Sequence, residues 1–378
     1  MVLTRMREEN RQRWSMKRGR TPHREPGRST LWRRPSLWAL LLALLGWGGV
    51  ERATVHGQSH ASVESLESGW LGLPLDCRFG ETCWVANYVD VDSTAAARDF
   101  RCNPRTYDGH DGVDVAIRDL AQMRRGVPVL AGAAGVVRSV RDGMEDVALT
   151  DQASRDRIKG RECGNGVVLQ HEDGWETQYC HLRRGSVGVA KGERIDRGAP
   201  LGLVGLSGQT EFPHVHLTVR RKGQAIDPFT GHTPVEGCGL AVAPLWRQDQ
   251  AVAYEEVALV NAGFSPGQPD IAAIRNGDGS EATLPSTAQA VVLWVDILGV
   301  QAGDRVRFRI HGPDQALVFE QEQPIERTQA RRFAFAGTRR RAEVWPAGVY
   351  TGQVTLIRLQ GDEPEHTMTR TVTINRGR

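Results

Sequence analysis

Short apolar runs separated by glycine-containing turns fill residues 106–230, and this pattern limits the possible folds more than any other feature of the chain. Examples are the runs at 126–132, 135–140 and 164–171. Runs of this length bounded by glycine are typical of β-strands. An Asp-Gly pair at 173–174 separates two of them, which predicts a β-hairpin. Residues 106–230 are therefore expected to form an antiparallel β domain.

A second strand-rich block follows at 253–378. Val306, Phe308 and Ile310 alternate with three arginines between 304 and 310, and 353–359 and 369–374 behave similarly. Strands of this kind separated by turns predict a β-sandwich, with the immunoglobulin-like fold as the expected type. The predicted fold class is mainly β, with an antiparallel β-sheet domain followed by this sandwich.

Positive charge is concentrated at the N-terminus. Residues 1–34 contain 11 Lys or Arg and 3 Glu, whereas the remainder contains 37 basic and 42 acidic residues. The folded part is therefore mildly acidic. Proteins held to nucleic acid by phosphate electrostatics need clustered surplus positive charge. We therefore expect no nucleic-acid partner.

An uncharged apolar run at 37–50 follows Arg33 and Arg34. A spanning helix needs about 20 apolar residues, whereas a basic segment before a shorter apolar run is typical of a secretory signal. We expect a cleaved signal, with an uncleaved inner-membrane anchor or a buried helix as alternatives. Cleavage after residue 53, 57 or 61 remains open. The protein is predicted to be exported to the periplasm or cell envelope, touching membrane only through this segment.

The chain contains six cysteines, all after the apolar run. An even number of cysteines in an exported protein predicts disulfides. No Cys-x-x-Cys pair occurs, which argues against a cysteine-rich zinc site. Cys77–Cys83 would close the shortest loop, but the pairing stays open among Cys77, Cys83, Cys102, Cys163, Cys180 and Cys238.

The predicted organisation has five parts. They are a leader and the start of a linker at 1–61, a disulfide-tied irregular lead-in at 71–105, the first β domain at 106–230, a linker at 231–252 and the sandwich at 253–378. Within the first domain, the charged stretch at 143–162 is predicted to be an insertion loop.

The first candidate site motif contains His110 and Asp114. An offset of four residues returns both side chains to roughly the same side of an extended or helical segment. Gly109 and Gly112 allow a tight path and a close approach of a ligand. A neutral imidazole nitrogen and a carboxylate oxygen suit zinc.

Two further motifs lie on predicted strands. His214 and His216 are two residues apart, so they face the same way with Cβ atoms roughly 6–7 Å apart. Tyr179 and His181 have the same spacing and are expected to share a strand face. His171 and Glu172 do not begin a His-Glu-x-x-His zinc helix, because residue 175 is Trp.

Taken together, the motifs supply three zinc ligands and two further histidines. Two histidines and one carboxylate with a fourth position open are the arrangement of catalytic zinc, whereas structural sites usually have four protein ligands. The remaining histidines would then act as acid and base on a zinc-bound water.

In their order and spacing, these motifs resemble the lysostaphin-like, LytM-type zinc metallopeptidases of family M23, which are peptidoglycan endopeptidases. Three further stretches are also similar to that family: the strand and turn sequence at 164–182, Gly-Ala-Pro-Leu-Gly at 198–202 and Ser-Gly at 207–208. The resemblance covers roughly 105–230 and implies that His110, Asp114 and His216 bind Zn2+ while His181 and His214 are catalytic. It implies hydrolysis of peptidoglycan peptide stems by a metal-activated water.

One departure from the family lies at 211–213, where Glu-Phe-Pro replaces the usual small or hydroxyl residue. Three other functions remain open: a non-catalytic cell-envelope regulator of other murein hydrolases, an endopeptidase for glycine-rich proteins, and a structural zinc protein. The last would need a fourth protein ligand, and the sequence offers no clear candidate.

Overall fold

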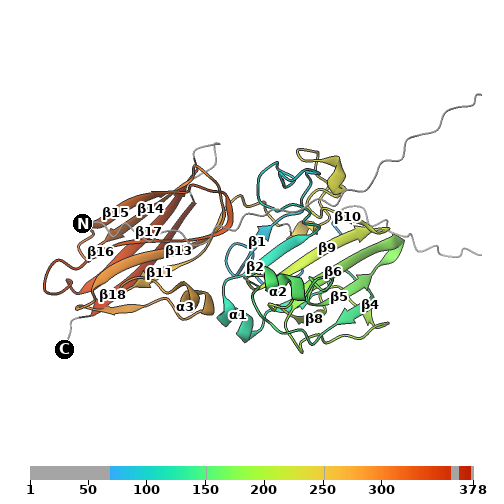
Figure 1. The fold of residues 1–378 in the computed structure, drawn as a ribbon, viewed down its shortest axis with the longest axis horizontal. Coiled ribbons are helices and arrows are strands. Elements are labelled where there is room, and N and C mark those ends of the chain that lie inside the picture. Colours follow the sequence, from blue (N-terminus) through green and yellow to red (C-terminus); the bar gives the residue numbers. More distant parts are fainter. Residues whose placement is uncertain (1–68, 150, 251, 359–365, 376–378) are drawn as a thin grey trace, which may run out of the picture. The chain divides into compact units, whose positions relative to one another are not determined.

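The computed structural model describes residues 69–378 except 150, 251, 359–365 and 376–378 (Figure 1). Strands dominate these residues, and the prediction of a mainly β chain is confirmed. The predicted signal segment at 37–50 and its cleavage points lie outside the described residues. In the part of the chain that is described, no helix is long and apolar enough to span a membrane.

The first block forms an eight-stranded antiparallel sheet, as predicted. The strand order is β1-β2-β9-β6-β5-β4-β7, with β10 paired to β9, and β3 pairs with β8 in a separate two-stranded sheet. The strands are β1 Cys83–Asn87, β2 Val113–Ile117, β3 Pro128–Leu130, β4 Gly135–Arg141, β5 Asn165–Gln170, β6 Trp175–Leu182, β7 Arg194–Ile195, β8 Pro200–Leu203, β9 His214–Arg221 and β10 Gln224–Ile226. The helices are α1 Leu120–Arg125 and α2 Gln152–Arg157, with a 3-10 turn at Glu172–Gly174.

The predicted hairpin joins β5 to β6. Asp173 and Gly174 both have positive φ, at 53° and 75°. Two consecutive residues with positive φ match the right-handed twist of the paired strands, and Asp-Gly is a favoured pair for that turn. The hairpin prediction is therefore confirmed.

Strand β9 has one apolar face and one polar face. Val215, Leu217 and Val219 are fully buried in the core of the first block. Side chains alternate across a strand, so His214, His216 and the residues that follow at the same spacing lie on the opposite face. This alternation keeps the imidazoles out of the apolar core and aligns them along one side of the sheet.

The lead-in and the linker are less separate from this domain than predicted. β1, which lies inside 71–105, is an edge strand paired with β2, so the lead-in is only partly irregular. Leu245 and Trp246, from the predicted linker at 231–252, are buried in the same core. Burial of these two large apolar side chains stabilises the fold, so part of the predicted linker packs into this core, and the domain boundaries stay a prediction.

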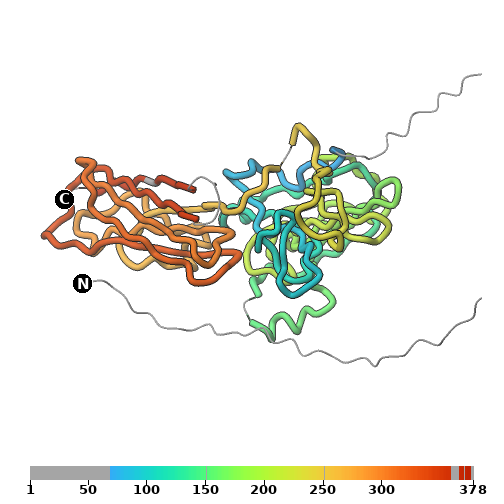
Figure 2. Tube along the Cα trace, turned by 90° about the horizontal axis from the view of Figure 1, so that it is seen from above, coloured from blue at the N-terminus to red at the C-terminus, as the bar shows by residue number. Residues whose placement is uncertain are grey.

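The three disulfides of the described residues all involve the first block or the residues beside it. The pairs are Cys77–Cys83, Cys102–Cys238 and Cys163–Cys180. The short-loop pairing is among them. The stretch predicted as an insertion loop contains α2 and projects from its surroundings (Figure 2, green).

The second block has a core of its own, enclosed by two sheets. The sheets have the orders β11-β13-β16 and β12-β18-β17-β14-β15, with β12 and β18 parallel. Its elements are β11 Ala258–Ser265, α3 Ile271–Asn276, β12 Thr283–Pro285, β13 Ala290–Val300, β14 Arg305–His311, β15 Leu317–Pro324, β16 Gln329–Arg339, β17 Gly348–Ile357 and β18 His366–Asn375. Val306, Phe308 and Ile310 alternate into this core as predicted. The immunoglobulin-like type of the sandwich stays a prediction.

Candidate metal centre and catalytic histidines

Strand pairing brings two of the predicted ligands together. β2 and β9 are antiparallel neighbours, and their register places Asp114 directly opposite His216. His110 lies in the turn before β2, where its backbone N–H donates to the carbonyl of Tyr107. Gly112 makes room for this arrangement, because a Cβ there would lie 2.6 Å from His216 Nε2.

The three predicted ligand atoms converge. His110 Nε2 lies 3.2 Å from Asp114 Oδ1 and 3.1 Å from His216 Nδ1, and the last two atoms are 2.9 Å apart. Ligand atoms around a tetrahedral zinc ion with bonds of about 2 Å lie roughly 3.3 Å from one another. His110, Asp114 and His216 therefore fit a small divalent ion such as zinc in both chemistry and spacing.

Each candidate ligand is oriented by a hydrogen bond at its other polar atom. His110 Nδ1 donates to the carbonyl of Tyr88 at 2.6 Å, and His216 Nε2 lies 2.9 Å from Thr218 Oγ1. Asn87 Nδ2 donates to Asp114 Oδ2 at 2.8 Å. Partners of this kind set the tautomer and direct the free lone pair toward a metal.

The two remaining histidines lie beside this group. The ring centroids of His181 and His214 are 4.6 Å apart, and His214 Nε2 is 3.3 Å from Asp114 Oδ1. His181 Nδ1 donates to the carbonyl of Ser207 at 2.8 Å. His214 Nδ1 donates to the carbonyl of Phe212 at 2.9 Å. In a neutral ring whose Nδ1–H donates in this way, Nε2 carries the free lone pair.

The electrostatics separate the roles of these groups. Burial, followed by the charges of His214 and His216, holds the pKa of His181 well below its usual range, so its ring is neutral at pH 7. Burial lowers the pKa of His216, but Asp111 and Asp114 outweigh burial and raise it to about 9. The carboxylates thus favour a cation at the ligand group, while His181 stays an uncharged base.

Tyr179 departs from the sequence prediction. It is fully buried on the core side, where its hydroxyl accepts from the N–H of Gly132 at 2.7 Å. His181 lies among the site histidines instead. The expected shared face is wrong because His181 has a φ of 64°, which interrupts the strand alternation.

Several site residues carry no sequence signal of their own. Asn87, Thr218 and Thr210 contact the candidate ligands or His214, and Asp111 lies 3.3 Å from His216 Nε2. Ser207 was part of the family-like text, but without an assigned role. These side chains could be found only by following hydrogen bonds outward from the histidines.

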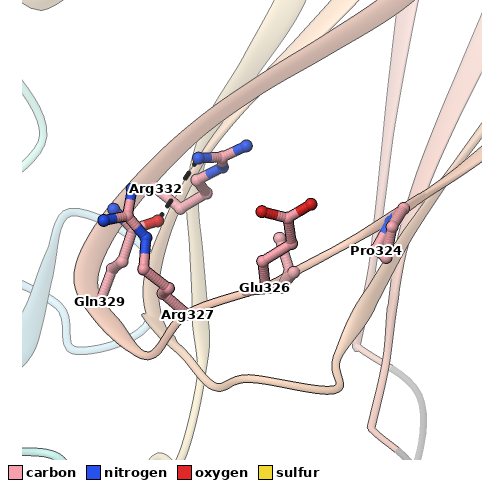
Figure 3. Close-up of a pocket in the computed structure, with 6 residues that line it drawn as sticks. Pro324, Glu326, Arg327, Gln329 and Arg332 are labelled. Atoms are coloured by element: carbon pink, nitrogen blue, oxygen red, sulfur yellow. Dashed lines mark hydrogen bonds between the residues drawn. The ribbon is translucent and has the colours of Figure 1, made fainter. Parts of the chain in front are cut away.

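Two other features lie outside the group. His171 is buried, with Nδ1 donating to the carbonyl of Ala134 and Nε2 2.8 Å from Thr177 Oγ1, so both nitrogens are occupied in a structural role. A hollow of about 190 Å³ in the sandwich contains no candidate residue (Figure 3). Its lining comprises Pro324, Ile325, Glu326, Arg327, Gln329 and Arg332.

Comparison with known proteins identifies relatives of the first block. The family model described as peptidase family M23 matches residues 108–228. Peptidoglycan DD-endopeptidase ShyA of Vibrio cholerae is 30% identical over 102 residues, which cover 25% of this chain and 23% of that protein. DD-carboxypeptidase/endopeptidase Mpg of Neisseria meningitidis is 31% identical over 139 residues, which cover 36% of this chain and 26% of that protein.

The matched stretch thus spans about a quarter of the length of these curated relatives. Among solved structures, a zinc-containing peptidase from Vibrio cholerae aligns with 39% of each chain, at 24% identity and a TM-score of 0.25. Residues 108–228 of this chain thus match the family model of peptidase family M23, and the curated relatives align with part of the chain.

Proposed function

We propose that this protein is an exported zinc-dependent endopeptidase that hydrolyses peptide cross-links of peptidoglycan. The observation that carries the proposal is the convergence of three ligand atoms within 4.8 Å of one another, next to His181 and His214, whose rings are 4.6 Å apart. Two histidines and one carboxylate are typical of catalytic rather than structural zinc.

His110, Asp114 and His216 would hold the ion. Bound there, zinc would act as a Lewis acid toward a peptide carbonyl and lower the pKa of a coordinated water. The neutral His181 would accept a proton at Nε2. His214 would donate toward the carbonyl oxygen or the leaving amine from its own Nε2 after protonation. The match to peptidase family M23 supports peptide-bond cleavage as the reaction.

The substrate follows from the relatives and the leader. ShyA and Mpg are named for peptidoglycan or DD-peptide cleavage, and the apolar run at 37–50 predicts export to the compartment that contains peptidoglycan. The peptide stems are therefore the proposed partner. The two-domain division and the role of the sandwich are part of this proposal, with no ligand assigned to the sandwich.

Mass analysis of fragments released from purified peptidoglycan tests the proposal. Zinc-loaded protein should release peptides cut at cross-links, and Asp114→Ala should release none because the ion loses an anionic ligand. Asp108→Ala is the matched control, since this exposed aspartate lies in the same turn region. If protein with a measured full complement of zinc releases no fragment, the proposal is wrong.

Replacing His181 separates chemistry from metal binding. His181→Ala should lower turnover about 10²–10⁴-fold, which is the usual contribution of a general acid or base, while zinc affinity stays near the wild-type value. His232→Ala serves as control, because the imidazole of this partly exposed histidine interacts with Glu236 and with the carbonyl of Ala241 rather than with a site residue. Equal turnover of His181→Ala and wild type would remove His181 from the mechanism.

A further inference from the structure

The disulfide Cys163–Cys180 lies directly beside a candidate catalytic residue. Cys180 precedes His181 on β6 and is paired with His216 across the sheet. Its partner Cys163 also contacts His181 through the backbone, because the N–H of His181 donates to the Cys163 carbonyl at 2.8 Å. Cys163 thus restrains the turn of the backbone at His181 in two ways, through the covalent bond to Cys180 and through the hydrogen bond to His181.

His181 needs such restraint because its backbone conformation is unfavourable. His181 has a φ of 64°, which is uncommon for a residue other than glycine. Conformations of this kind are unfavourable and persist only where the surroundings enforce them. On the far side of His181, the carbonyl of Leu182 accepts from Ser207 Oγ at 2.7 Å and from Asn165 Nδ2 at 3.1 Å. The turn is therefore restrained at both ends.

The chain before Cys163 is also linked, through Thr210, to the other catalytic candidate, His214. We call residues 143–163, apart from residue 150, the 143–163 segment. Leu149 N–H donates to the carbonyl of Thr210 at 2.8 Å, and Thr210 Oγ1 is 3.0 Å from His214 Nδ1. Gln209 N–H donates to the Glu162 carbonyl at 2.7 Å. The segment is thus connected to the surroundings of both histidines.

The metal ligands receive their support from elsewhere. Asn87, the last residue of β1, holds Asp114, and Tyr88, the residue after β1, holds His110. His216 is held by Thr218 within β9. None of these hydrogen bonds involves the 143–163 segment. Loss of the disulfide should therefore disturb His181 without removing the metal ligands.

We infer that the Cys163–Cys180 disulfide is a positioning element, which anchors the 143–163 segment and holds the imidazole of His181 in its working orientation. The inference deepens the proposed function and rests on it, since His181 is the proposed base. This positioning role explains why a cysteine stands at position 180, between Tyr179 and His181.

The test compares two disulfide-removal variants, each studied as full-length protein. Cys163→Ala with Cys180→Ala removes the bridge beside His181. Cys102→Ala with Cys238→Ala is the matched control, because that bridge closes a longer loop, with a sequence separation of 136 rather than 17. The control should lose at least as much stability in the chain-entropy account of disulfides.

For Cys163→Ala/Cys180→Ala we expect kcat on cross-linked peptidoglycan fragments to fall by about 10²-fold, the cost of misplacing a reacting group by about 1 Å. KM and zinc affinity should stay close to wild type. The control should keep the wild-type kcat. Equal kcat values for the wild type and the Cys163/Cys180 variant would overturn the inference.

A second readout needs no substrate. The Nδ1–H of His181, which donates to the buried Ser207 carbonyl, should give a slowly exchanging NMR signal in the wild type and in the control. That signal should be lost in the Cys163/Cys180 variant. A wild type without turnover whose variant still loses the signal would contradict the proposed function alone, whereas retention of the signal would contradict the positioning role.

If the Cys163/Cys180 variant does not fold, the folded wild type can be reduced stepwise with a phosphine and its free thiols mapped by alkylation. The fall in kcat should then follow the opening of Cys163–Cys180 and not that of the other two bridges. Full activity with this bridge open would overturn the inference.

Discussion

Asn87 lies behind the candidate metal centre and orients the one anionic ligand. Its Nδ2 donates to Asp114 Oδ2 and leaves Oδ1 directed at the two imidazoles. Asn87 belongs to the lead-in, a part of the chain for which the sequence predicts no chemistry. Outer partners of this kind fix the orientation of a ligand and so contribute to metal affinity.

Replacing Asn87 with Ala should weaken zinc binding about 10–100-fold, the typical effect of losing an outer partner. Competition with a chromophoric chelator measures the affinity. Asp108→Ala should bind zinc like the wild type. An unchanged zinc affinity for Asn87→Ala would show that Asp114 is oriented without this hydrogen bond.

Asp227 is a buried carboxyl group outside the site. Its Oδ1 accepts from the N–H of Phe229 at 2.8 Å, whereas Oδ2 has no hydrogen-bond partner among the described residues. Burial raises its pKa from 3.8 to about 7, and the charge of Asp99 acts in the same direction. The folded protein therefore holds this proton at pH values where the unfolded chain has already released it.

The free energy of unfolding should consequently lose a contribution as pH rises from about 4 to about 7, because the folded state binds more protons in that range. Asp227→Asn removes this dependence. Relative to the variant, the wild type should therefore lose unfolding free energy as the pH rises to about 7. Above that pH the difference between the two proteins should be constant. Urea unfolding of zinc-free protein at several pH values measures it, and a constant difference would contradict the raised pKa.

At the scale of elements, the pairing of β2 with β9 creates the candidate metal centre. Each strand carries one candidate ligand, the two ligands are register partners, and Gly112 leaves room for His216 by having no side chain. The sequence indicated that His214 and His216 share a face, because strand periodicity is local. It could not indicate which strand lies next to β9, because pairing is decided by the packing of distant segments.

Gly112→Ala should weaken zinc binding and lower stability, because its Cβ would lie 2.6 Å from both His216 Nε2 and the Leu217 carbonyl. The carbonyl is backbone and cannot move without disturbing the β2–β9 pairing. Gly188→Ala is the matched control, since a Cβ there meets no atom within 4 Å and its φ is not positive. Zinc titration and thermal unfolding of both variants provide the measurement. Equal zinc affinity and equal unfolding temperature of the two variants would show that β2 and β9 accommodate the added methyl group.

The turn at His181 shows where strand periodicity fails to predict side-chain direction. Alternation predicts that Tyr179 and His181 share a face, and a single residue with positive φ reverses that result. The hairpin at 173–174 was predictable, because Asp-Gly is a local signal for its turn. Nothing local signals a left-handed histidine, which depends on Cys163 and on the residues around Leu182.

At the scale of the whole molecule, two large apolar cores organise the described residues, beside a smaller third cluster. One large core contains residues of the lead-in, of strands β1 to β10 and Trp246, and the other lies between the two sheets of the sandwich. His110 and His216 are 106 residues apart in sequence. Their contact exists only in the folded first block, so a bound metal must stabilise that fold.

Zinc should therefore raise the thermal stability of the first block. An ion that binds only the folded state stabilises it by about 2.7 kcal/mol at a free concentration 100-fold above Kd. Calorimetry with zinc and with a chelator should show a lower unfolding temperature after chelation. Asp114→Ala should respond little to either, and an equal response of this variant and the wild type would place the zinc elsewhere.

By itself, the sequence determined the mainly β class, the hairpin and the alternating strands of the second block, and it indicated five candidate site residues, because side-chain periodicity, turn chemistry and ligand type are local properties. Only the tertiary structure decided the neighbours of each strand, the oxygen and nitrogen atoms that orient each ligand, the pairing of the cysteines and the reversed direction of His181. These features depend on contacts between segments far apart in the chain, where packing and hydrogen-bond satisfaction select one arrangement among many that local patterns allow.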